Sequence, residues 1–126
     1  MKKIRLLVPL AYAGFIYYLS SRTWGDAPSI PYLDKIIHVL LYLGLSIAIM
    51  WGIRSFKQTN NKVIGLAAFL LALAYGISNE IHQLYVHGRE CSVFDVMADG
   101  AGAMLGVLLA LLFLSIRQRG NTHSKK

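Results

Sequence analysis

The sequence predicts an all-α fold, an integral membrane four-helix bundle that forms a single domain over residues 1–126 with both termini in the cytoplasm. Three observations support this prediction. Charged residues make up 15% of the chain and hydrophobic residues 56%, whereas a typical soluble domain carries about 25% charged residues. The apolar residues form four runs, each long enough to cross most of a hydrocarbon layer about 30 Å thick. The basic residues gather between these runs and at the two termini.

The first predicted span covers about residues 4–20 and opens on a basic stretch that contains Lys2, Lys3 and Arg5. A secretory signal peptide begins in the same way, but it ends in a cleavage site made of small residues. The residues that follow the apolar run, 17–25, contain no clear site of this kind. We therefore expect the segment to be retained as a membrane span.

Three further spans are predicted at about residues 36–53, 63–85 and 95–116, and a basic tail follows over residues 117–126. His38 is the only basic side chain of the second span before its end, and Asp99 is the only acid between residues 96 and 116. Backbone groups in lipid must form their hydrogen bonds within the segment, so all four runs are expected to be helices.

The orientation follows from lysine and arginine, which concentrate on the cytoplasmic side of membrane proteins. Ten of the 13 fall on one side of the predicted bundle: Lys2, Lys3, Arg5, Arg54, Lys57, Lys62, Arg117, Arg119, Lys125 and Lys126. The other three are Arg22, Lys35 and Arg89. All six acids share the outer side with these three: Asp26, Asp34, Glu80, Glu90, Asp95 and Asp99. The pattern predicts a multi-pass protein with its N- and C-termini inside.

The net charge of +7 does not indicate a nucleic-acid partner. The basic residues lie in short clusters between apolar runs, whereas nucleic-acid binding requires them along one polar face. The single cysteine, Cys91, excludes an intramolecular disulfide.

Polar residues recur at helical spacing near the outer ends of three predicted spans. The second span carries Asp34, His38 and Tyr42 four residues apart, the third carries Glu80 and Gln83, and the fourth carries Asp95 and Asp99. The stripe of the fourth span continues into Gly102 and Gly106, small residues that let a neighbouring helix approach closely. Together these stripes predict an outward-facing polar pocket with nine binding residues: Asp34, Lys35, His38, Tyr42, Glu80, Gln83, Arg89, Asp95 and Asp99.

Several kinds of chemistry are open to such a pocket. Arg89, Lys35 and His38 suit an anionic headgroup, whereas His38 with Glu80 or Asp99 is a candidate acid–base pair in catalysis. Alternatively, the charged residues form ion pairs that only fix helix packing. A metal site is not expected, because carboxylate-bridged metal bundles use Glu-x-x-His and here His82 follows Glu80 by two residues. No cofactor is expected either.

The order of these residues resembles the VanZ-like family over about residues 10–112. The residues that carry the resemblance are Ser20, Ser21, Pro31, Asp34, Lys35, His38, Tyr42, Glu80, Gln83, Arg89, Ser92, Asp95, Asp99, Gly102 and Gly106. Two positions depart from the family pattern. Asn79 stands where an acid is common, and Asp99 stands where asparagine is usual.

The resemblance implies a small bacterial plasma-membrane protein associated with resistance to teicoplanin-type glycopeptide and lipoglycopeptide antibiotics, and it implies no particular reaction. We accordingly expect the pocket to bind an envelope lipid, a lipid-linked precursor or a lipoglycopeptide. The alternatives are a membrane-embedded hydrolase or transferase that acts on an envelope lipid, and a structural membrane protein. The sequence predicts no oligomeric state.

Overall fold

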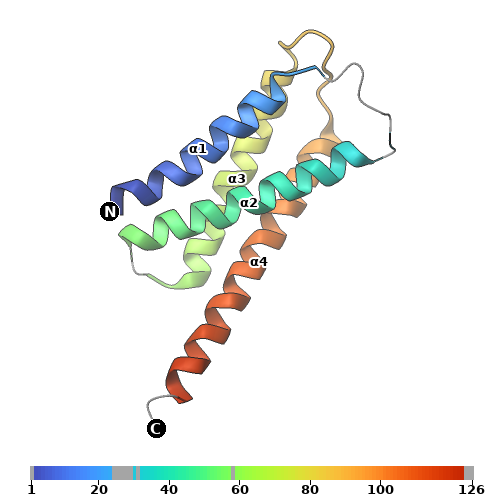
Figure 1. Ribbon diagram of the computed structural model, residues 1–126. Coiled ribbons are helices and arrows are strands. Elements are labelled where there is room, and N and C mark those ends of the chain that lie inside the picture. Colours follow the sequence, from blue (N-terminus) through green and yellow to red (C-terminus); the bar gives the residue numbers. More distant parts are fainter. Residues whose placement is uncertain (1, 24–29, 31, 58, 124–126) are drawn as a thin grey trace.

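The structure, a computed structural model, describes residues 2–23, 30, 32–57 and 59–123 (Figure 1). Asp26, Pro31, Lys125 and Lys126, which the sequence analysis used, lie outside the described residues. Within the described residues the chain forms four helices and no strand: α1 (Lys2–Ser20), α2 (Leu33–Phe56), α3 (Asn61–Gln83) and α4 (Val93–His123). The prediction of an all-helical fold is confirmed.

The helix ends differ from the predicted spans at several places. α4 continues to His123, through most of the predicted basic tail, because Arg117, Gln118 and Arg119 favour helix and nothing before Gly120 interrupts it. α3 begins after Asn60, whose side chain accepts a hydrogen bond from the backbone N–H of Lys62 at 2.9 Å. This contact caps the helix and fixes its start.

Three of the four helices in the described part of the chain are long and apolar enough to cross a membrane: α2, α3 and α4 up to Asn121. α1 is not among them. It has 19 residues, of which Lys2, Lys3 and Arg5 are basic, and these charges shorten its apolar part. A fourth span at α1 therefore stays a prediction.

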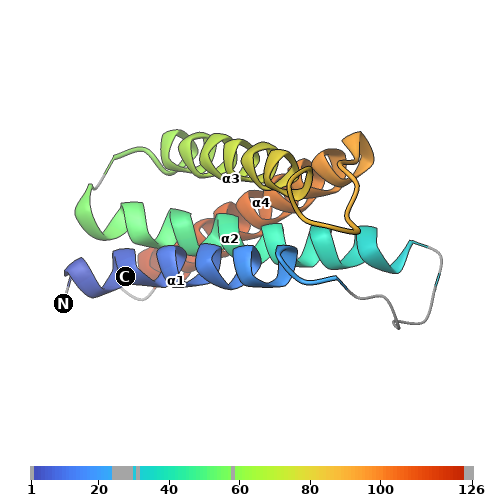
Figure 2. The same ribbon diagram turned by 90° about the horizontal axis from the view of Figure 1, so that it is seen from above.

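The two ends of the bundle differ in what they contain. α1 runs antiparallel to α2 (Figure 2), so that the backbone of Arg5 lies beside Gly52 and the Arg5 guanidinium lies over the ring of Trp51. The later part of α4 lies beside the start of α3, where Val107 faces Gly65. The N-terminus, the link between α2 and α3 and the C-terminal part of α4 therefore share one end. The polar stripes lie at the other.

The closest helix packing is between α2 and α4. A methyl group placed on Gly102 would overlap the backbone of Val39, and one placed on Gly106 would overlap the backbone of Leu43 and the hydroxyl of Ser46. The absence of side chains at these two positions lets the backbones meet, as small residues do in membrane bundles. This contact sets the register in which the polar ends of α2 and α4 face each other.

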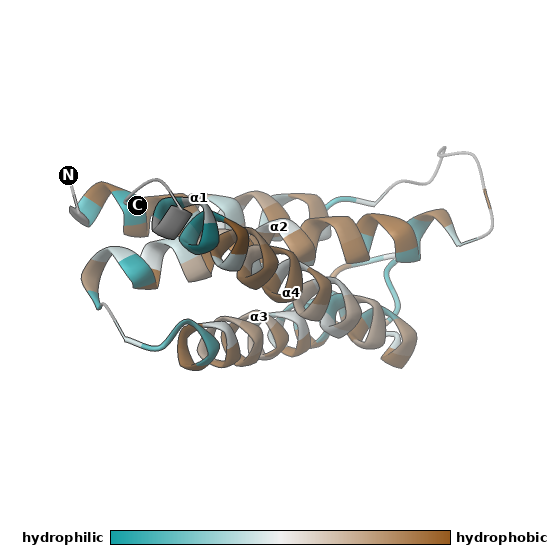
Figure 3. Cartoon of the chain, turned by 90° about the horizontal axis from the view of Figure 1, so that it is seen from below, coloured by the Kyte–Doolittle hydropathy of each residue, from teal (hydrophilic) through white to brown (hydrophobic). Residues whose placement is uncertain are grey.

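Large apolar side chains cover much of the outer surface. Hydrophobic residues, brown in Figure 3, make up most of α2 and α4. On α4 they form a continuous exposed group: Leu105, Leu108, Leu109, Leu112, Phe113 and Ile116. The buried core is correspondingly small, and several of its members, including Ala68, Ala72 and Ala103, have short side chains that bring the helices together.

Candidate functional site

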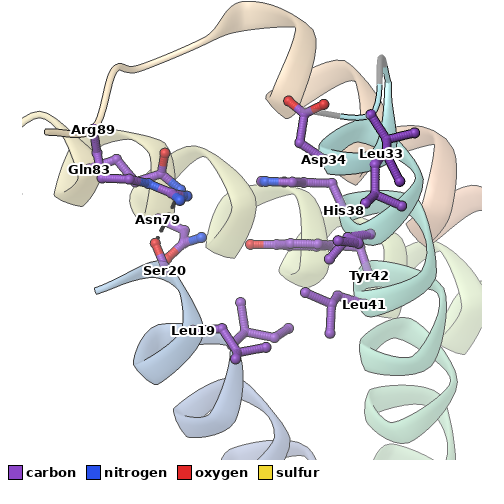
Figure 4. A pocket seen from close by; sticks show the side chains of 13 residues that line it. Leu19, Ser20, Leu33, Asp34, His38, Leu41, Tyr42, Asn79, Gln83 and Arg89 are labelled. Atoms are coloured by element: carbon purple, nitrogen blue, oxygen red, sulfur yellow. Dashed lines mark hydrogen bonds between the residues drawn. The ribbon is translucent and has the colours of Figure 1, made fainter. Parts of the chain in front are cut away.

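A cavity of about 560 Å³ opens between α1, α2 and α3 near their polar ends (Figure 4). One part of its wall is apolar: Ile16, Leu19, Ile30, Leu33, Ile37 and Leu41. The other part is polar: Ser20, Asp34, His38, Tyr42, Asn79, Gln83 and Arg89. In Figure 4, His38 and Tyr42 point into the cavity from α2, opposite Asn79, Gln83 and Arg89. The cavity is therefore amphipathic.

His38 occupies the boundary between this cavity and a buried acidic region. Its Nδ1 lies 2.7 Å from Oδ1 of Asp99, which is fully buried on α4. Its ring is parallel to that of Tyr42 one turn further along α2, with 6.5 Å between the ring centres. The spacing of four residues in the sequence brings the two rings to the same face, and Asp99 fixes the rotation of the imidazole.

Lys35 links the first turns of α2 and α4. Its ammonium group donates to Oδ2 of Asp34 and to Oδ1 of Asp95. Asp34 is mostly exposed, whereas Asp95 is buried. The bridge to Asp95 is therefore the one that ties the two helices together, one turn above the bond between His38 and Asp99.

Glu80 lies in the same buried region on α3. It is 1% exposed, and its Oε2 accepts a hydrogen bond from the backbone N–H of Ser92 at 3.1 Å. Its Oε1 has no hydrogen-bond partner in the described part of the chain, and neither has Oδ2 of Asp99. The contact with Ser92 anchors the start of α4 to α3.

Gln83 and Asn79 form the α3 side of the cavity. Gln83 is buried and donates from Nε2 to Oγ of Ser20 on α1 at 3.2 Å. His82, the residue before Gln83, faces α1 instead. Its ring contacts Tyr17, and its Nε2 lies 3.3 Å from Oγ of Ser21. The expectation from sequence that His82 points away from Glu80 agrees with this arrangement.

Arg89 lines the mouth of the cavity from the link between α3 and α4. It follows Gly88, whose φ of +80° is a conformation that residues with a side chain rarely adopt. Among the described residues, Arg89 forms no salt bridge with a carboxylate. In the described part of the chain, the guanidinium at the cavity therefore has no carboxylate within salt-bridge distance.

The sequence predicted one pocket formed by nine residues. In the structure these nine residues fall into two groups. Five line the cavity: Asp34, His38, Tyr42, Gln83 and Arg89. The other four do not line it: Glu80, Asp95 and Asp99 are buried in the protein interior behind His38, and Lys35 bridges Asp34 and Asp95. α1 supplies a wall that the sequence analysis had not assigned, through Ile16, Leu19 and Ser20.

Gly76 is a further position that the sequence analysis did not identify. A methyl group there would lie 2.8 Å from Oδ2 of Asp99 and 3.2 Å from Cε1 of Tyr42. Gly76 therefore makes the space in which Asp99 reaches His38. Its spacing of four residues from Glu80, on the same face of α3, is the signal in the sequence that would have found it.

Comparison with known proteins bears on this arrangement. The family model described as VanZ/LLP1 matches residues 2–114, which include all of these side chains. An uncharacterized protein of Schizosaccharomyces pombe is 26% identical over 110 residues, which are 87% of this chain and 60% of that relative. The chain thus spans less than two thirds of the length of this relative. No solved structure matches the chain significantly.

Proposed function

The chain belongs to the VanZ/LLP1 family, and from the chemistry of its cavity we propose that it is an integral membrane protein that binds the anionic headgroup of an envelope lipid. The observation that carries the proposal is the guanidinium of Arg89, which has no carboxylate partner among the described residues, at a cavity whose remaining wall is largely apolar. A guanidinium presents a planar set of N–H donors that matches a phosphate or carboxylate group.

The two halves of the cavity wall suit the two parts of an amphiphile. The headgroup lies against Arg89, His38 and Gln83, and the hydrocarbon chain lies against Ile16, Leu19 and the apolar residues of α2. The volume of about 560 Å³ falls in the range of about 300–1,000 Å³ that small-molecule sites occupy. Lipid-linked precursors and lipoglycopeptides share this combination of polar head and apolar chain.

Insertion into a membrane is part of the proposal. Soluble proteins rarely expose a continuous apolar patch of more than a few hundred Å², and α4 alone exposes Leu105, Leu108, Leu109, Leu112, Phe113 and Ile116. Lipid is the solvent that suits this surface. The bacterial source and the link to teicoplanin-type resistance come from the family resemblance, and the fungal relative is a reason to look for a ligand common to both kinds of organism.

The test is the retention of lipid by purified protein in nanodiscs. We expect mass spectrometry to find an anionic lipid that copurifies, and we expect Arg89→Ala to lose it. A hydrogen bond to a charged group contributes about 1.5–3 kcal/mol, so the affinity should fall by roughly tenfold or more.

Arg22→Ala is the matched control. Arg22 is exposed on the same end of the bundle and donates to the hydroxyl of Tyr18, and it does not line the cavity. Its replacement should leave lipid retention unchanged. Equal retention by wild type and Arg89→Ala contradicts the proposal of an anion site.

A second candidate is a membrane-embedded hydrolase or transferase, and the bond between His38 and Asp99 favours it. A buried carboxylate that orients a histidine whose ring faces a cavity is an arrangement used for acid–base catalysis. The sequence offered Glu80 or Asp99 as the partner of His38, with Glu80 as the first choice. In the structure Asp99 contacts the imidazole, and Glu80 accepts a hydrogen bond from Ser92. Turnover of a bound lipid that is lost in His38→Ala, with binding intact, would support this candidate over simple binding.

A further inference from the structure

Three side chains from three helices meet behind His38. One ring nitrogen of His38 on α2, one carboxylate oxygen of Glu80 on α3 and one carboxylate oxygen of Asp95 on α4 all lie within 4.8 Å of one another. None of these residues is a sequence neighbour of another. Their convergence depends on the packing of the whole bundle.

Two oxygens in this region lack the partner that burial demands. Oε1 of Glu80 and Oδ2 of Asp99 are buried without a hydrogen-bond donor among the described residues, and their residues are 1% and 0% exposed. An unpaired buried polar atom is costly, and more so when it belongs to a charged group. Glu80, which carries one of these oxygens, is a member of the three-residue group.

The charges of the region are also unbalanced. Three buried carboxylates belong to it, those of Glu80, Asp95 and Asp99, and Lys35 is the one lysine or arginine that forms a salt bridge with any of them in the described part of the chain. With these acids ionised and His38 neutral, two negative charges remain. A divalent cation offsets both of them, and buried charges in proteins are paired or coordinate metals.

We propose that His38, Glu80 and Asp95 bind a divalent transition-metal ion. The imidazole nitrogen selects this class, because Mg²⁺ and Ca²⁺ prefer sites made of oxygen alone, whereas imidazole and carboxylate together suit Zn²⁺ or Fe²⁺. Three protein ligands with a remaining open position form the usual arrangement of a reactive zinc site. The donors must move inward on binding, since zinc bonds are about 2.0–2.2 Å long.

Asp99 and Lys35 support the three ligands without being part of them. Metal-binding histidines ordinarily give their second ring nitrogen to a carboxylate, which fixes the ring and its tautomer. Asp99 accepts that bond from Nδ1 of His38. Lys35 donates to Oδ1 of Asp95, which holds this carboxylate at the start of α4.

The metal content of the full-length protein tests the proposal. Protein purified in detergent through a tag without histidine is stripped with EDTA, incubated with Zn²⁺ and passed through a desalting column. We expect about one zinc ion per chain and a higher thermal unfolding temperature, because an ion that binds only the folded state stabilises it. His38→Ala and Glu80→Gln should each lose the zinc and the zinc-dependent rise in unfolding temperature.

Two variants of the same residue types serve as controls. His82→Ala removes a histidine that faces α1, and Glu90→Gln removes an exposed acid outside the group; both should keep the zinc. Should His38→Ala fail to fold, His38→Asn replaces it. Circular dichroism and gel filtration establish the folded state of each variant.

The results separate clearly. Wild-type protein without zinc overturns the proposal, and so does equal zinc content in wild type, His38→Ala and Glu80→Gln. Loss of zinc from His82→Ala alone also overturns it. The zinc test is distinct from the lipid test, since the measurement is made without added lipid and Arg89→Ala, which should lose the lipid, should keep the zinc.

Discussion

The contact between His38 and Asp99 is the strongest polar feature at the scale of single residues. It joins a half-buried histidine to a fully buried acid across two helices. Removing one partner of a buried pair costs about 3–5 kcal/mol, because the other charge is left without a partner. The pair therefore limits which substitutions the bundle tolerates, whatever the cavity binds.

A double-mutant cycle on this pair separates its structural contribution from any role in binding. We expect His38→Ala to lower the free energy of unfolding by about 3–5 kcal/mol in the wild-type background. In the background of Asp99→Ala the loss should be smaller by about 0.5–3 kcal/mol, which is the usual coupling between contacting residues. Unfolding in mixed detergent micelles, followed by circular dichroism, supplies the four free energies.

Additive effects would mean that the bond does not contribute to stability. Coupling combined with unchanged lipid retention in the double variant would favour the structural alternative, in which the polar residues only fix helix packing. Coupling combined with loss of lipid and retained folding would favour the binding function.

The sequence identified most residues of this region, but it could not pair them. Spacing of three or four residues assigns side chains to a face of one helix, and so His38, Glu80 and Asp99 were all expected at one end of the bundle. The rotation of each helix about its axis decides which acid meets the histidine, and spacing within one helix carries no information about it. For that reason the sequence left Glu80 and Asp99 as alternative partners of His38, and it did not show the space that Gly76 leaves for Asp99.

At the scale of helices, the contact between α2 and α4 determines the architecture. Gly102 and Gly106 bring these helices so close that Val39 and Leu43 present their backbone carbonyls to the glycines. The sequence predicted this track of small residues on α4, because two glycines four residues apart on an apolar helix are typical of close packing. It could not name the partner helix, since every span offers an apolar face.

Glycine-to-alanine substitutions at matched positions test this contact. Gly102→Ala should lower stability by about 1–3 kcal/mol or more, because the added methyl group overlaps the backbone of Val39 and forces the helices apart. Gly14 on α1 has no atom within 4 Å of an added methyl group. Gly14→Ala should therefore leave stability unchanged or raise it by about 0.5–1 kcal/mol, the usual helix preference of alanine.

Thermal unfolding of both variants in the same detergent is the measurement. If Gly14→Ala lost as much stability as Gly102→Ala, alanine would be tolerated no better in open space than in the contact between α2 and α4. That contact would then not be the cause of the loss in Gly102→Ala.

At the scale of the whole molecule, charge and hydrophobicity are arranged along one axis. The described basic residues Lys3, Arg5, Arg54, Lys57, Lys62, Arg117 and Arg119 lie near the end that holds the N-terminus. The described acids lie at the opposite end with the cavity. The sequence predicted this division from the positive-inside tendency alone, and it predicted the number of helices, but hydropathy does not decide whether α1 crosses the membrane.

The single cysteine provides a direct test of the orientation. Cys91 is exposed in the link between α3 and α4, which the N-in topology assigns to the outer side. We expect a membrane-impermeant maleimide to label Cys91 in intact cells. In the background of Cys91→Ser, Thr59→Cys between α2 and α3 should be labelled only after the membrane is permeabilised.

A third reporter addresses α1. Lys3→Cys in the Cys91→Ser background should also need permeabilisation if α1 crosses the membrane with its start inside. Labelling of Lys3→Cys in intact cells would leave three membrane spans with the termini on opposite sides, and labelling of Thr59→Cys in intact cells would reverse the proposed orientation.

The bridges from α2 to α4 have a consequence for how the protein is made. Lys35 and His38 find their acidic partners 60 and 61 residues later in the chain. At a synthesis rate of about 5–20 residues per second, roughly 3–12 seconds pass between the two. Throughout that interval the ammonium of Lys35 has Asp34 but not Asp95 as a partner, and the imidazole of His38 is without Asp99. The contacts of Lys35 and His38 with α4 therefore form late in biogenesis. Until α4 has been synthesised, these polar groups must be kept out of the lipid in some other way.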